Sequence, residues 1–111
     1  MSKIDSLLQT LETKTASGRI QWIRTENERA FEAQFESGSS VWILQYTWFD
    51  EHDEVKYGYR ATVFDNRGDV IDTIDHKDST ANLQVLYESA RRNAMNADEI
   101  IGDLLEELEE A

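Results

Sequence analysis

The residues of this chain best suited to chemistry form two clusters that mix histidine with carboxylates. The first is the run Asp50-Glu51-His52-Asp53-Glu54, and the second comprises Asp72, Asp75, His76 and Asp78. Carboxylates beside an imidazole can bind metal ions, but neither spacing matches a calcium-binding loop, and His52 has no second histidine at a ligand spacing. We expect solvated loops at both places, with a metal site as the alternative interpretation.

No catalytic constellation stands out in the rest of the chain. Lys14 and Thr15 form a candidate functional pair, but a lysine at this place also suits the negatively charged end of a helix. Neither a Ser/His/Asp arrangement nor paired carboxylates can be argued from spacing. The chain has no cysteine, which excludes disulfides and thiolate metal sites. We therefore expect a non-enzymatic protein without a cofactor.

The charge of the chain is strongly negative. It carries 23 acidic against 11 basic residues, a formal net charge of −12. Such a surface repels nucleic acids and anionic membranes, so we expect direct binding to neither. The favoured interpretation is a solvated acidic surface. Adaptation to high salt is one alternative, and an inhibitor that mimics a nucleic acid is another.

With 111 residues, the chain is expected to form a single domain, residues 1–111. No apolar run approaches the ~20 residues that a membrane span needs. The first residues space their leucines through polar positions and so lack the apolar block of a signal peptide. These observations favour a cytoplasmic location.

The elements that must position any site are arranged around the stretch from Ser40 to Phe49. This run is rich in β-branched and aromatic residues, and alternate positions on both of its faces are apolar. A strand with two apolar faces needs neighbours and cover, so it is expected in the centre of a sheet. The periodicities of the flanking segments predict a helix, a five-stranded antiparallel meander and two C-terminal helices, an α+β fold with all helices packed on one face of the sheet. The expected helices are Lys3–Ala16, Asp78 or Ser79 to Asn93 and Ala97–Glu109, and the expected strands are Arg19–Arg24, Ala30–Glu36, Ser40–Phe49, Val55–Phe64 and Asp69–Asp75.

Alternation along these strands assigns side chains to two faces. The face covered by helices should carry Ile20, Trp22, Phe31, Ala33, Phe35, Val41, Ile43, Tyr57, Tyr59, Ala61 and Val63. The opposite face should carry Ile23, Trp42, Leu44, Tyr46, Trp48, Arg60 and Phe64. An exposed patch of this size usually marks an interface, in which Trp, Tyr and Arg dominate the binding energy. The alternative is a curled sheet in which these residues form a second core.

The C-terminal helix is a second candidate for partner binding. From Met95 onward the chain has seven acids and no base, including Glu106, Glu107, Glu109 and Glu110 at the negative end of the helix dipole. Such a surface suits a basic protein partner; a frayed, solvated helix end is the plain alternative.

The opening Leu8-x2-Leu11-x2-Lys14-Thr15-x2-Gly18-x-Ile20-x-Trp22 resembles that of a group of small bacterial proteins without assigned function. The turn Asp65-x2-Gly68 and the segment Leu83-x2-Leu86-Tyr87-x2-Ala90-Arg91, followed by an acidic Ile/Leu helix, are similar too. The resemblance implies the same α+β layout and carries no activity or catalytic residue.

The leading hypothesis is therefore a small acidic protein-binding domain of the inhibitor, immunity or antitoxin type. It would act through the aromatic sheet face, the acidic C-terminal helix, or both. A homodimer with apposed sheet faces is the first expected form of such an interface, followed by a heterologous protein partner. The competing class is a small-molecule or metal-binding module.

Overall fold

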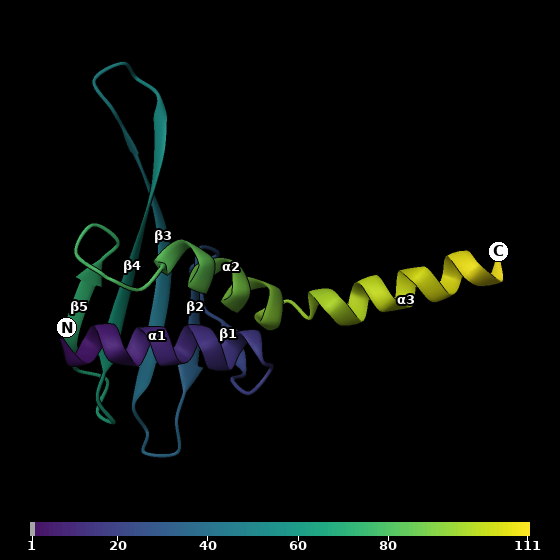
Figure 1. Cartoon of the computed structure of the whole chain (residues 1–111), viewed down its shortest axis with the longest axis horizontal. Helices are drawn as coiled ribbons and strands as arrows, with labels where there is room; N and C mark the ends of the chain where they lie inside the picture. The colour runs from purple at the N-terminus through teal and green to yellow at the C-terminus, as the bar shows by residue number, and fades with distance from the viewer. Residues whose placement is uncertain (1) are drawn as a thin grey trace.

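The fold is that of a helix-covered antiparallel sheet, seen here in a computed structural model that describes residues 2–111. The described chain contains three helices and five strands (Figure 1). In chain order they are α1 (Lys3–Ala16), β1 (Trp22–Arg24), β2 (Ala30–Gln34), β3 (Ser40–Phe49), β4 (Val55–Phe64), β5 (Val70–Asp75), α2 (Leu83–Ala94) and α3 (Ala97–Glu110). The predicted α+β class and order of elements are confirmed.

The five strands form one sheet in the order β1-β2-β3-β4-β5, so β3 lies in its centre as predicted. All pairs are antiparallel, and β3 and β4 pair along ten residues each, from Ser40 opposite Phe64 to Phe49 opposite Val55. The turns into β3 and β5 use Gly38 and Gly68 at φ +89° and +84°, a region that glycine enters without a Cβ penalty. β1 is shorter than expected and begins at Trp22, whose backbone N–H donates to Asn93 Oδ1 of α2 at 2.6 Å.

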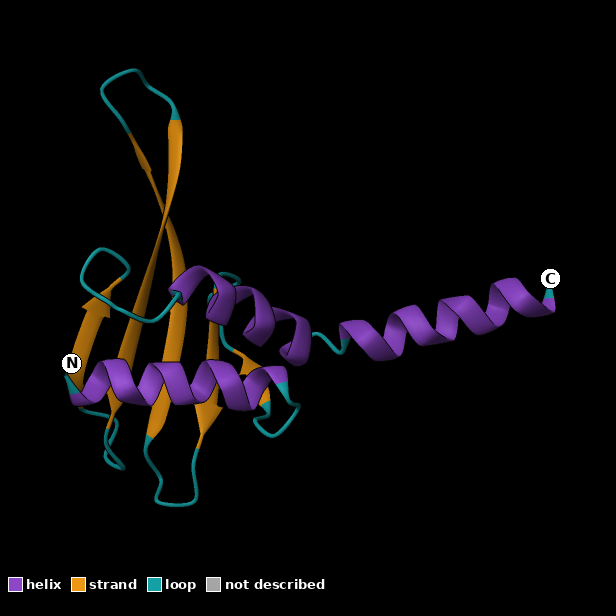
Figure 2. Ribbon diagram, in the orientation of Figure 1, coloured by secondary structure: helices purple, strands orange, loops and turns teal. Residues whose placement is uncertain are grey.

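α1 and α2 cover one face of the sheet and form the core with it (Figure 2). The buried core residues are Leu8, Leu11, Trp22, Phe31, Ala33, Val41, Ile43, Tyr59, Ala61, Ala81, Leu83, Leu86, Tyr87 and Ala90. The sheet residues among them belong to the predicted covered face. Thr15 is also buried, and its hydroxyl accepts a 2.9 Å hydrogen bond from Trp22 Nε1. Its role is therefore structural.

α1 starts at the predicted cap. Ser2 Oγ accepts from the backbone N–H of Asp5 and donates to the carboxylate of Asp5. That carboxylate also accepts from the Ser79 hydroxyl at 3.1 Å and from the Thr80 backbone N–H at 3.0 Å, which fixes the loop before α2. The last two of these hydrogen bonds join the start of α1 to a segment more than 70 residues later.

α2 starts later than the sequence predicted. Its cap is Asn82, whose side chain accepts from the backbone N–H of Val85, whereas Asp78 and Ser79 precede the helix. The Ser79 hydroxyl donates to Asp5 and accepts from the backbone N–H of Ala81, so it closes a turn in the loop before α2.

α3 is where the arrangement differs from the expected one, in which all helices pack on the sheet. It extends away from the body of the molecule beyond the end of α2 (Figure 1). None of its residues, 97–110, all described, is buried. The chain changes direction at Asn96, which precedes the helix, adopts the left-handed conformation (φ 52°) and makes no side-chain capping bond.

The β3–β4 hairpin also extends beyond the cover of the helices (Figure 1). Tyr57, which the alternation assigned to the covered face, is 56% exposed, and Phe49 on the same face is 70% exposed. Their positions along the strands place them past the reach of α1 and α2, so a correct face assignment does not bury them.

Candidate functional site

The sheet face opposite α1 and α2, here called the open face, brings together one set of the predicted binding residues. It comprises Trp42, Leu44, Tyr46, Trp48, Arg60 and Phe64. All of these come from the paired strands β3 and β4. Trp48 is 41% exposed, Arg60 is exposed, and the other four are partly buried without a covering layer of helices. The prediction of an aromatic face is thus correct in its position.

Trp42 lies in a local cluster in which its indole N–H group is hydrogen-bonded. Its Nε1 donates to Glu32 Oε2 at 2.9 Å, and Gln34 donates to the other oxygen of Glu32. The ring packs against Phe64 with centroids 5.6 Å apart. Aromatic pairs at this spacing contribute beyond their buried area. A second molecule could therefore contact the apolar ring surface without competing for its N–H group.

The most elaborate polar cluster of this face centres on Asp75, which is the last residue of β5. Tyr46 Oη donates to Asp75 Oδ2 at 2.6 Å, and Arg60 Nη2 lies 3.5 Å from the same oxygen. His76 Nδ1 lies 2.9 Å from Asp75 Oδ1. The guanidinium of Arg60 also stacks over the Tyr46 ring, 5.1 Å from its centroid. Asp75 thus ties the aromatic face to the edge strand.

These contacts shift the pKa values of Tyr46 and Asp75 in opposite directions. The hydrogen bond to Asp75, together with burial, raises the pKa of Tyr46 above its ordinary value of 10.0. Burial alone would raise the pKa of Asp75, but the hydrogen bonds from Tyr46 and from the Lys77 backbone, with the charges of His76 and Arg60, lower it below 3.8. At neutral pH, Tyr46 is protonated and donates a hydrogen bond to the ionised carboxylate of Asp75. The cluster is therefore suited to holding β3, β4 and β5 together.

Gly58 makes room for this cluster. It lies directly opposite Tyr46 in the β3–β4 register, and a Cβ at its position would overlap Cζ, Cε2 and Oη of the tyrosine ring. The ring therefore lies flat across the glycine. A close approach of this kind is a recognised reason for glycine inside a strand.

Sequence reasoning missed both Gly58 and the Asp75 cluster. It assigned Asp75 and His76 to a solvated loop, because the pairing of Tyr46 with Asp75 joins positions 29 residues apart. The register gives the only signal: Tyr46 faces Gly58, and Arg60 faces Asp75. That register could have been derived from the two turns, but the contact of Tyr46 on β3 with Asp75 on β5 also needs the ring to cross β4 over Gly58.

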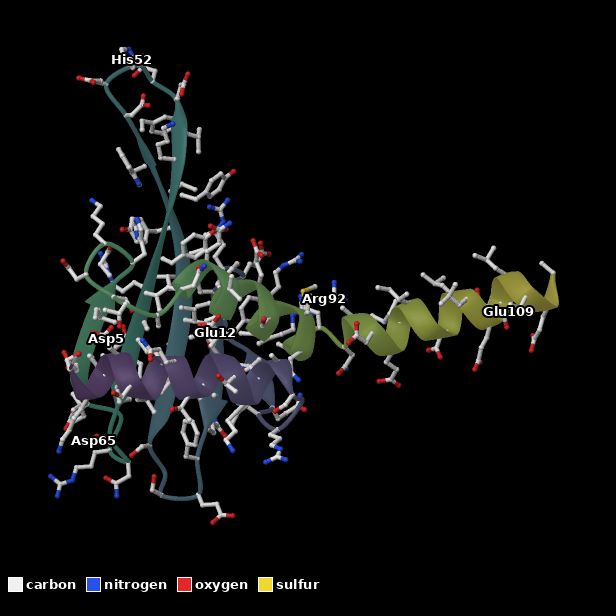
Figure 3. The ribbon with its side chains drawn as sticks, viewed as in Figure 1. Asp5, Glu12, His52, Asp65, Arg92 and Glu109 are labelled. Atoms are coloured by element: carbon white, nitrogen blue, oxygen red, sulfur yellow. The ribbon has the colours of Figure 1, made fainter. Side chains whose placement is uncertain are left out.

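The acidic hairpin tip, labelled at His52 in Figure 3, lies at the far end of the projecting hairpin. Asp50 Oδ1 accepts from the backbone N–H groups of His52 and Glu54 at 2.8 and 3.0 Å, so the Asp50 side chain closes the turn. Among residues 2–111, no group of three or more His, Asp or Glu side chains could hold a metal ion. The geometry fits the solvated-loop interpretation of this cluster.

The acidic helix lies far from the open face (Figure 3, Glu109). On α3, five large apolar residues are between 46% and 72% exposed: Ile100, Ile101, Leu104, Leu105 and Leu108. At 3.6 residues per turn they form one side of the helix, here called the apolar stripe. Glu107 borders the stripe, whereas Glu106 lies opposite its centre. The structure thus separates the predicted binding residues into two surfaces.

The end of α2 adds a third feature that the sequence analysis did not single out. Where α2 meets α3, a groove is lined by Arg91, Arg92, Met95, Ala97, Ile100 and Ile101. Arg92 also pairs with Asp98 of α3 at 2.7 Å. The two arginines are the only bases near the first turn of the acidic helix within the described residues 83–111.

Comparisons of the chain with protein-family models, with curated proteins and with solved structures find no match. Within residues 2–111, no helix has the length and apolar character needed to cross a membrane. The function of the chain is therefore inferred from its own geometry.

Proposed function

We propose that this chain is a non-enzymatic protein-binding domain that contacts its partner chiefly through α3. The observation that carries the proposal is the apolar stripe, in which five leucine and isoleucine side chains are exposed in one row and only Ile100 and Ile101 line a groove with the end of α2. Isolated helices of this length are marginally stable in water, and most helices gain their stability by packing an apolar face. A partner that covers the stripe would supply this packing.

The charge of α3 narrows the kind of surface that it fits. Glu107 and Asp98 border the stripe on opposite sides, so a partner surface should combine apolar side chains with Lys or Arg at the rim. Inhibitors, immunity proteins and antitoxins act through contacts of this kind, and the acidic composition favours a domain of that type. The open face is a second contact surface, on which Trp48 and Arg60 are the most exposed of the predicted residues.

The test is affinity capture with three forms of the full-length chain in a lysate of the source cells. The intact chain is compared with a stripe variant, Ile101→Asp with Leu108→Asp, and with a control, Glu106→Gln, on the opposite side of α3. Captured proteins, including further copies of the chain, are quantified by mass spectrometry. We expect a protein that the intact chain and the control retain and the stripe variant loses. Equal capture by all three forms would contradict the proposal.

A further inference from the structure

We propose that the partner of α3 is a second copy of this chain, and that the two α3 helices pack in antiparallel directions about a two-fold axis. This inference rests on the proposed function and names the protein that α3 binds. It follows from a complementarity between the two ends of α3. The first end adjoins the groove with Arg91 and Arg92, of which Arg92 also pairs with Asp98, and the last turn carries Leu108 flanked by Glu107 and Glu109.

In an antiparallel pair, the last turn of each α3 lies beside the α2–α3 junction of the other copy. Leu108 of one copy then contacts the groove around Ala97 and Ile101, which is mostly apolar. The acids of the same turn approach the two arginines at the groove's end. A two-fold axis produces this contact twice, because an interface between identical copies uses the same patch on both.

The arrangement of the helix permits this pairing without rearrangement. α3 contacts α2 at its first turn and beyond it extends clear of α1, α2 and the sheet, so a second helix can lie along it (Figure 1). Its 14 residues correspond to about 21 Å of helix, over which the stripe is continuous. The acids that point away from the stripe, such as Glu106, remain in solvent on both copies.

Two other solutions are disfavoured. In a parallel pair, the acidic last turns of the two copies would lie side by side, and the arginines of the two copies would lie together at the other end. Like charges would then repel at both ends. Folding of α3 onto the open face of its own chain is prevented by the connection. Met95 and Asn96 reach about 7 Å, whereas α2 lies on the other side of the sheet and layers pack about 10 Å apart.

The first measurement is solution mass by light scattering across a range of concentrations of the full chain. We expect a dimer of twice the 12.9 kDa chain mass. Leu104→Asp, in the middle of the stripe, should abolish the dimer, and Glu106→Gln, on the opposite side of the same helix, should retain it. Because Leu104 is 52% exposed, this change is not expected to unfold the domain, which circular dichroism would verify.

A charge-reversal mixture tests the antiparallel direction. One chain carries Arg91→Glu with Arg92→Glu, and the other carries Glu107→Arg with Glu109→Arg. Each chain alone should lose the dimer, since like charges then meet at both contacts. An equimolar mixture should regain it, because both contacts become complementary, and this recovery also shows that each variant folds.

The possible results separate this inference from the proposed function. A monomer at all concentrations, a dimer that survives Leu104→Asp, or a mixture without recovery would each overturn the antiparallel pairing. If the chain is monomeric but lysate capture still depends on the stripe, the protein-binding function stands and the second copy is wrong. If neither occurs, both proposals fail.

Discussion

The contact between Tyr46 and Gly58 gives the sharpest prediction about stability. In Gly58→Ala, the new methyl group would occupy the space of the tyrosine ring, so the ring must move off the strand. That movement also breaks the 2.6 Å hydrogen bond from Tyr46 to Asp75. The substitution is conservative in size and leaves the charge unchanged, which makes the steric effect easy to isolate.

The magnitude follows from three contributions. Alanine in a strand gains about 0.5–1 kcal/mol over glycine from backbone entropy. Overpacking costs about 1–3 kcal/mol, and a lost hydrogen bond to a charged group costs about 1.5–3 kcal/mol. The steric and hydrogen-bond losses exceed the entropic gain, so Gly58→Ala should lower the free energy of unfolding by about 1.5–5.5 kcal/mol.

Urea unfolding followed by tryptophan fluorescence measures this loss. A matched control is Gly102→Ala on α3, where an added Cβ meets no atom within 4 Å, and which should not destabilise the chain. In a Tyr46→Ala background the ring is absent, so Gly58→Ala should become neutral or stabilising. If the cost of Gly58→Ala is the same with and without the tyrosine ring, the steric explanation is refuted.

Three further predictions concern the junctions between elements. The hydrogen bonds that Asp5 accepts, first of all from the Thr80 backbone, lower its pKa below 3.8. The contribution of Asp5 to stability is therefore present above that pH and is lost as the pH falls through the folded-state pKa. Acid unfolding of Asp5→Asn should show a shallower pH dependence than that of the intact chain. Thr15→Val leaves the buried Nε1–H of Trp22 without its acceptor and should cost about 1–3 kcal/mol in urea unfolding, with equal stability counting against the hydrogen bond. Asn82→Ala removes the cap of α2 and should cost about 1 kcal/mol, whereas no loss would place the start of the helix elsewhere.

The sequence by itself determined the elements of this protein and the two faces of its sheet. Alternation along Ser40–Phe49 and Val55–Phe64 predicted both ten-residue strands with their observed bounds, and helical spacing of leucines predicted Lys3–Ala16. These predictions succeed because the period of side-chain direction is a local property of the backbone. The open face was predicted for the same reason, since each strand's alternation fixes which residues share a face.

Tertiary structure alone decided what lies beside these elements. Tyr46 of β3 reaches Asp75 of β5 across Gly58, Ser79 bonds to Asp5 and Ala81 in the loop before α2, and Tyr57 is exposed because the helices end short of it. α3 has the stripe of a packed helix, yet the turn at Asn96 directs it away from the core. Periodicity shows which side of an element is apolar, but the surface that covers it depends on chain paths that local spacing does not encode.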